Sequence, residues 1–145
     1  MAHSIILFLP GVKFIQARLS KIQKLGAHFR QFYPDWRIVL LANWREESGQ
    51  FIREICHEGG GHVLVFARVE VPEETFYHFH TELKNLGEHS IGDTFLFAKQ
   101  NVVREPFEVF EEEGRWARRS NFLVEGYPLI ITEYFTQEGL ACLPD

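Results

Sequence analysis

Strand-like segments follow one another through most of this chain, and they do not alternate regularly with helices. They are rich in β-branched and aromatic residues and span residues 36–44, 50–57, 62–71, 94–103, 106–111, 119–125 and 128–136. Parallel strands would need long crossover connections, which are usually helical. The sequence therefore predicts an α+β fold with a single antiparallel β-sheet of about six strands, and it argues against a doubly wound parallel sheet.

Two segments have the helical rather than the strand-like spacing of apolar residues. Between residues 12 and 33 apolar residues recur at steps of three or four, which predicts one amphipathic helix. Residues 73–85 follow Pro72 and return to the same spacing. Because no repeat, low-complexity tract or linker is visible, we expect residues 1–145 to form one domain.

The charge balance excludes one broad class of partner. Lys and Arg number 15 against 20 Asp and Glu, for a formal net charge of -5, whereas a general nucleic-acid binder usually has a basic face. Arg outnumbers Lys two to one. Because the guanidinium is planar and two-pronged, this bias suits contact with carboxylates.

The compartment is expected to be the cytoplasm. Two cysteines, Cys56 and Cys142, are too few for a disulfide framework, which favours a reducing environment. The first ten residues lack a basic lead and a cleavage pattern, so they are not interpreted as a signal peptide. No apolar window reaches the length of a spanning helix, and stable membrane insertion is not expected.

Three predicted strands each place one ionisable residue on an otherwise apolar face, because alternate side chains of a strand point the same way. The sets are Phe51, Arg53 and Ile55; Leu64, Phe66 and Arg68; and Leu129, Ile131, Glu133 and Phe135. Arg and Glu are rarely buried unless they are paired. Two interpretations stay open: an internal ion pair or exposed strand edge, and a small enclosed site for an anionic ligand.

Other suggestive patterns have simpler explanations. His78 and His80 resemble metal ligands, but residues two apart on a helix point about 200° apart and cannot share one ion. The run Gly59-Gly60-Gly61 precedes a predicted strand rather than a helix, so it is interpreted as a hairpin turn and not as a phosphate loop. No metal or cofactor site is predicted.

A set of motifs between Arg45 and Phe135 occurs in a characteristic order. The motifs are Phe51-Ile52-Arg53-Glu54-Ile55, then Ala67-Arg68-Val69-Glu70-Val71-Pro72, then Leu86-Gly87-Glu88-His89-Ser90-Ile91-Gly92, then Gly114-Arg115-Trp116-Ala117-Arg118-Arg119-Ser120, and last Tyr127-Pro128-Leu129-Ile130-Ile131-Thr132-Glu133-Tyr134-Phe135. In this order they resemble the bacterial chorismate lyase (chorismate–pyruvate lyase) family.

The resemblance implies a function and a site. Members of the family cleave chorismate to 4-hydroxybenzoate and pyruvate without metal or cofactor, as the first step of bacterial ubiquinone biosynthesis. They are monomers in which helical flaps close over a buried product site. Arg53 matches the arginine that binds the ring carboxylate, Glu133 the glutamate beside the hydroxyl, Ile91 a position whose backbone N–H touches the carboxylate, and Leu25 a methionine of the N-terminal helical segment.

These implications lead to specific expectations for the charged residues. Chorismate carries two carboxylates, so we expect Arg53 to bind the ring carboxylate and Arg68 to face the carboxylate of the enolpyruvyl arm. Glu133 is expected to act in general acid/base catalysis. The runner-up is a non-catalytic small-acid-binding module of the same fold, like the effector-binding domains of some transcription regulators. A third alternative is a structural protein with an internal ion pair.

Overall fold

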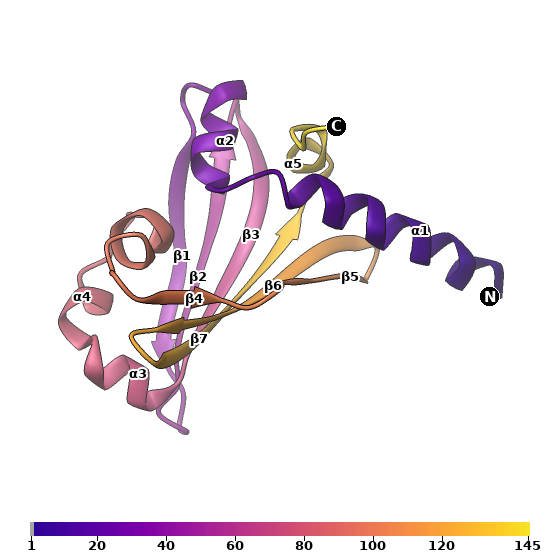
Figure 1. Cartoon of the computed structure of the whole chain (residues 1–145). Helices are drawn as coiled ribbons and strands as arrows, with labels where there is room; N and C mark the ends of the chain where they lie inside the picture. The colour runs from indigo at the N-terminus through magenta and orange to yellow at the C-terminus, as the bar shows by residue number, and fades with distance from the viewer. Residues whose placement is uncertain (1) are drawn as a thin grey trace.

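All strands belong to one antiparallel sheet, and most of the helices lie against one of its faces (Figure 1). The computed structural model describes the backbone of residues 2–145 and the side chains of residues 11–92 and 94–145. The strand order is β1-β2-β3-β7-β6-β4, with β5 pairing β6. The predicted α+β class with an antiparallel sheet is confirmed.

Five of the strands have nine or ten residues, and β4 and β5 are shorter. The strands are β1 Arg37–Arg45, β2 Phe51–Gly59, β3 His62–Val71, β4 Val102–Arg104, β5 Glu108–Glu112, β6 Arg115–Val124 and β7 Tyr127–Phe135. Three hairpins close on two consecutive residues with positive φ, among them Gly60 at 59° and Gly61 at 79°. Such turns match the right-handed twist of the strands they join, so the predicted hairpin after β2 is confirmed.

The helix predicted over residues 12–33 is two helices, α1 Ala2–Leu19 and α2 Leu25–Phe32. The break between them has a packing cause, because it allows Leu19, Ile22 and Leu25 to be buried in one apolar cluster although the two helices run in different directions (Figure 1). Tertiary packing therefore overrides the continuous helical spacing. None of the described helices is long and apolar enough to cross a membrane.

The second predicted helix is also divided, into α3 Glu73–His78 and α4 His80–Lys84. The predicted strand over residues 94–103 is wrong: Gly92–Leu96 forms a π-helical turn, η1, and only the short β4 follows. Phe95 and Leu96 are both buried in the same apolar cluster. Neighbouring strand residues would point to opposite faces, whereas a helical turn can bury both.

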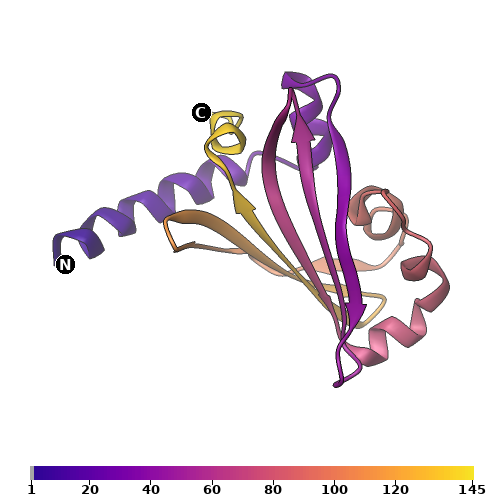
Figure 2. The ribbon, with the colours of Figure 1, turned by 180° about the vertical axis from the view of Figure 1, so that it is seen from behind.

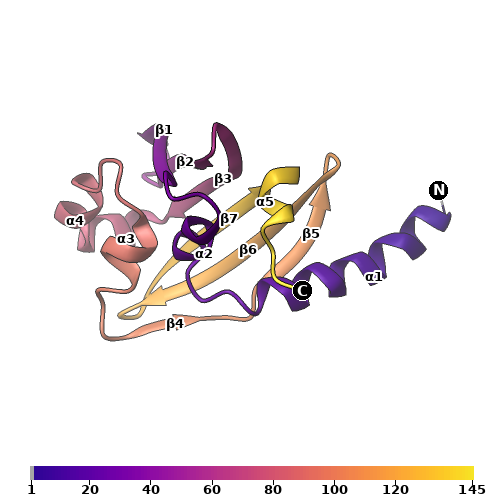
Figure 3. The same ribbon diagram turned by 90° about the horizontal axis from the view of Figure 1, so that it is seen from above.

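A last helix, α5 Gln137–Ala141, was not predicted. Thr136 caps it, because its side-chain oxygen accepts a hydrogen bond from the Gly139 N–H at 3.1 Å. From behind, the strands β1–β3 stand in front, with α2 partly behind them (Figure 2). From above, the sheet bends around α2, which lies in the hollow between β1–β3 and β4–β6 (Figure 3).

Candidate active site

A cavity of about 370 Å³ lies between the hollow face of the sheet and two covering segments. The sheet contributes residues of β2, β3, β7, β6 and β4. Gln23–Gly26 at the start of α2 and Ser90–Gln100 around η1 supply the rest of the wall. The volume falls at the small end of the range for ligand pockets, which suits one small molecule.

The register of the strands explains which side chains reach this cavity. Cross-strand partners on adjacent strands share a face, and two rows run across the sheet: Arg53, Val69, Ile131 and Ser120; then Ile55, Ala67, Glu133 and Arg118. All eight residues line the cavity. Two of the three ionisable residues predicted on apolar strand faces, Arg53 and Glu133, therefore meet at one site.

Arg53 is the buried cation at the β2 side of the site. It is 2% exposed, and its Nη2 donates a hydrogen bond to the carbonyl oxygen of His89 at 2.8 Å. No carboxylate pairs with it among the described side chains. Burial lowers the pKa of Arg53. A buried guanidinium without an acidic partner is suited to binding an anionic ligand.

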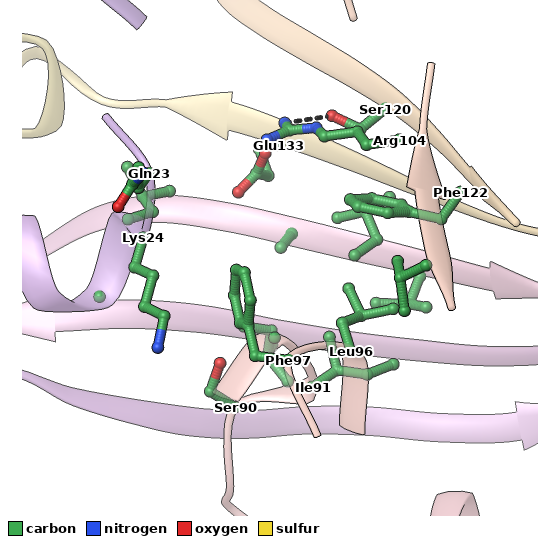
Figure 4. A pocket seen from close by; sticks show the side chains of 18 of the residues that line it. Gln23, Lys24, Ser90, Ile91, Leu96, Phe97, Arg104, Ser120, Phe122 and Glu133 are labelled. Carbon is green, nitrogen blue, oxygen red and sulfur yellow. Dashed lines mark hydrogen bonds between the residues drawn. The ribbon is translucent and has the colours of Figure 1, made fainter. Parts of the chain in front are cut away.

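Glu133 is held in place by a neighbouring strand. Arg118 is its direct partner on β6, and the Arg118 Nε donates a hydrogen bond to Glu133 Oε1 at 2.8 Å while Nη2 lies 2.7 Å from the same oxygen. Both residues are buried. Figure 4 shows the Glu133 side chain pointing into the cavity. The hydrogen bond described for this carboxylate uses Oε1, which leaves Oε2 available to a ligand.

Arg104 and Ser120 lie next to this pair. Arg104 Nη2 donates a hydrogen bond to the Ser120 hydroxyl oxygen at 2.6 Å (Figure 4). Burial, first, and the nearby charge of Arg118 lower the pKa of Arg104, while Glu133 opposes this shift. Arg104 and Arg118 also both lie over the ring of Phe107, each with its Cζ 5.3 Å from the ring centre. Two guanidinium groups thus gather around one carboxylate.

The charge of the cavity is opposite to that of the protein. Its described lining includes five cationic side chains and one carboxylate, Glu133; the cations are Lys24, Arg53, Lys99, Arg104 and Arg118. Lys99 has an ion pair with Glu82, which does not line the cavity. This arrangement attracts anions although the whole chain has a net charge of -5.

The remaining predicted contact residues, Ile91 and Leu25, both line the cavity. Ile91 stands at the N-terminal end of the η1 turn, where a backbone N–H has no acceptor in a preceding turn. Leu25 begins α2 and is buried. Among the described residues, no group of three or more His, Cys, Asp or Glu is arranged to hold a metal ion.

The expectation that Arg68 faces the ligand is wrong. Arg68 pairs across the strands with Glu54, on the face of the sheet opposite Arg53, and it does not line the cavity. Its guanidinium lies 3.5–3.8 Å from carboxylate oxygens of Glu46, Glu54 and Glu70. The apolar face assigned to β3 was misleading because Leu64 is buried in the apolar cluster with residues of α1 and α2 and does not line the cavity.

Several lining residues were missed from the sequence. Arg118 lies in one of the family motifs, but the sequence predicted no role for it. Arg104 lies just after residues 94–103, which were wrongly predicted to form a strand. His57 lines the cavity beyond Ile55 and accepts a hydrogen bond at Nδ1 from the Trp36 indole N–H at 3.1 Å. The alternation Arg53, Ile55, His57 was the signal that could have found it.

Comparisons with known proteins agree with this geometry. A family model described as chorismate lyase matches residues 39–140. A chorismate pyruvate-lyase of Pectobacterium carotovorum is 30% identical over 81% of this chain and 59% of its own length. Those of Erwinia tasmaniensis and Citrobacter koseri are 36% and 34% identical, each over 61% of this chain and 51% and 53% of their own lengths.

This chain therefore spans little more than half the length of these relatives. Among solved structures, a possible transcriptional regulator of Bacillus subtilis has a TM-score of 0.48 and 12% identity, over 72% of this chain and 59% of that chain. The matched residues include the strands that carry Arg53, Arg118 and Glu133. The chain belongs to the chorismate lyase family.

Proposed function

We propose that this protein is a lyase that converts chorismate to 4-hydroxybenzoate and pyruvate. One observation carries the proposal: Arg53, which has no carboxylate partner among the described residues, and Glu133, which is held by Arg118, face the same small cationic cavity. A cyclic carboxylate fits between them, with its acid group at Arg53 and its hydroxyl at Glu133. Family membership and the relatives' names support the same reaction.

The binding mode follows from the row structure of the sheet. Arg53 takes the ring carboxylate through charge-assisted hydrogen bonds, and the Ile91 backbone N–H is positioned to add one more. Val69 and Ile131, which share the row of Arg53 next to the row of Glu133, contact the ring. Leu25 closes the cavity from the side of α2. This arrangement fixes the ring in one orientation and excludes water from it.

The chemistry needs one base and no cofactor. Glu133 removes the proton from the ring carbon that carries the hydroxyl, and the electrons of that C–H bond complete the aromatic ring. The ether bond from the adjacent ring carbon breaks, its electron pair leaves with the enolpyruvate oxygen, and enolpyruvate takes up a proton at its methylene carbon to become pyruvate. Arg118 holds the Glu133 carboxylate in a fixed orientation for this step.

The pathway, the compartment and the oligomeric state of the protein are inferred as well. We infer that the product enters ubiquinone biosynthesis, and that the protein acts as a cytoplasmic monomer without nucleic acid. The family resemblance supports the pathway and the monomer, and the two free, buried cysteines support a reducing compartment. The cationic cavity is too small for a nucleic-acid strand, and the net charge of the chain is negative.

A coupled dehydrogenase assay of pyruvate release from chorismate tests the proposal. The wild type should release pyruvate. Glu133→Gln should abolish release while 4-hydroxybenzoate still binds in calorimetry, and Arg53→Gln should weaken that binding sharply. Glu54→Gln is the matched control, because Glu54 follows Arg53 on β2 and faces away from the cavity. Binding without pyruvate release would instead indicate the non-catalytic module.

A further inference from the structure

Two arginines of the cavity have no carboxylate partner among the described residues, and they come from strands on either side of it. Arg53 belongs to β2 and Arg104 to β4, and three strands lie between them in the sheet. The other arginine of the cavity, Arg118, is paired with Glu133. Arg53 is buried and Arg104 is exposed, and a ligand with a single carboxylate would contact only one of these two guanidinium groups.

Arg104 is directed into the cavity by its neighbours. Its Cα partner on β6 is Phe122, and Ser120, two residues along on the same face, accepts its hydrogen bond. The guanidinium also lies over the ring of Phe122, with Cζ 5.3 Å from the ring centre. Ser120 and Phe122 line the cavity as Arg104 does. The hydrogen bond uses one N–H direction and the guanidinium also contacts the rings of Phe107 and Phe122, so other N–H groups are left for a ligand.

We propose that Arg104 binds the carboxylate of the enolpyruvyl arm of the substrate. This inference rests on the proposed function, and it assigns to Arg104 the role that the sequence suggested for Arg68. The substrate is a dianion, while the aromatic product keeps only the ring carboxylate. Arg104 is therefore a group that distinguishes the substrate from the product.

The position of Arg104 fits the chemistry of the arm. The ether oxygen is bonded to the ring carbon next to the one that carries the hydroxyl, so the arm leaves the ring at the Glu133 end. Arg104 is at that end, since its guanidinium and that of Arg118, the partner of Glu133, lie over the same Phe107 ring. As the ether bond breaks, negative charge grows on the enolpyruvate oxygen, and a guanidinium on the arm stabilises that charge.

Calorimetry with two unreactive ligands separates this role from the rest of the site. The first ligand is 4-hydroxybenzoate, and the second is 3-(carboxymethoxy)-4-hydroxybenzoate, which adds an ether-linked carboxylate like that of the arm. Arg104→Gln should weaken binding of the second ligand by about ten- to hundredfold, as expected for a lost charge-assisted contact, and leave the first within about twofold. In the pyruvate assay it should lower kcat/KM by a similar factor.

Three further variants sharpen the test. Arg68→Gln removes the same charge from the other face of the sheet and should change neither affinity. Arg104→Lys should recover part of the binding of the dianion. Ser120→Ala removes the hydroxyl that positions Arg104, and it should weaken the dianion selectively even if Arg104→Gln folds poorly.

The outcomes are distinct. The inference is overturned if Arg104→Gln weakens both ligands equally, if Arg68→Gln weakens the dianion instead, or if the wild type binds the dianion no more tightly than 4-hydroxybenzoate. Selective, Arg104-dependent binding of the dianion without pyruvate release would support the inference while contradicting the proposed lyase activity. Binding of neither ligand would contradict both.

Discussion

Arg118 and Glu133 lie directly opposite each other on β6 and β7, and the Arg118 Nε donates to the Glu133 Oε1 at 2.8 Å inside the cavity. The carboxylate that the proposed reaction needs as a base is thus anchored by one oxygen. Its anchor comes from the neighbouring strand of the same hairpin. Stability and catalysis are therefore linked at this pair.

Removal of one partner should cost more stability than removal of both. Arg118→Met leaves Glu133 as a buried charge without its partner, and the free energy of unfolding should fall by about 3–5 kcal/mol. The double variant Arg118→Met/Glu133→Leu should recover much of that loss, because no uncompensated charge remains. Urea unfolding of the two single variants and the double variant measures the coupling. Arg119→Met, next along β6 on the opposite face, is the control; equal losses in all variants would contradict the expectation.

For a buried hydroxyl on the other face of β7 we expect the opposite effect, because its removal should raise the stability of the fold. Thr132 is buried, and its Oγ1 has no hydrogen-bond partner among the described residues. Thr132→Val keeps the shape and removes the unsatisfied hydroxyl, so stability should rise by about 1 kcal/mol. Thr75→Val is the matched control, because the Thr75 hydroxyl donates to the Pro128 carbonyl oxygen at 2.7 Å. The same substitution should be destabilising there, and a loss of stability in Thr132→Val would refute the argument.

The fold could be predicted from the sequence wherever local pattern and tertiary packing agree. The alternation of β2 and β7 and the turn at Gly60 and Gly61 are local properties, and they were predicted correctly. The break between α1 and α2 and the η1 turn depend on contacts with distant strands. Periodicity in the chain does not report such contacts.

The predictions for the site residues depended on the same difference between local pattern and tertiary contacts. Arg53 and Glu133 could be found because strand alternation and the family motifs singled out the same residues. The prediction for Arg68 was wrong because alternation identifies the two faces of a strand without saying which face lines the cavity, and Leu64 is buried in a separate apolar cluster. Arg104 was not found because it lies on a strand of three residues, which is too short to show an alternation of apolar and polar side chains.

The covering segments are joined across the cavity by Lys24 and Phe97. The Lys24 Nζ lies 4.6 Å from the centre of the Phe97 ring, although Phe97 is 54% exposed. Phe97→Ala should speed release of 4-hydroxybenzoate about two- to fivefold, since such exposed contacts contribute about 0.5–1 kcal/mol. Stopped-flow displacement of the bound product measures the rate. Tyr77→Ala removes a comparable exposed contact with Arg45 away from the cavity, and an equal effect there would contradict the prediction.

Both cysteines should be poor nucleophiles in the folded protein. Burial, first, and then Glu58 raise the pKa of Cys56, and burial raises the pKa of Cys142. The protonated thiols therefore favour the folded state below the unfolded pKa of about 8.5, and this contribution is lost as the pH rises through the higher folded pKa values. A chromogenic disulfide reagent at pH 8 should react far more slowly with the native protein than with the protein in urea. Cys56→Ala and Cys142→Ala assign the two thiols; rapid reaction of either native thiol would contradict the prediction.

The two ends of the cavity differ in how the chain must fold to build them. Arg118 and Glu133 are only 15 residues apart, across a hairpin closed by a two-residue turn, so they can meet early in folding. Arg53 reaches the same cavity only when β3 pairs with β7, which requires closure of a long loop. A ligand that contacts both Arg53 and Glu133 therefore stabilises the pairing of β3 with β7, which is the slowest strand pairing to form. Saturation with such a ligand should mainly slow unfolding of the β3–β7 seam.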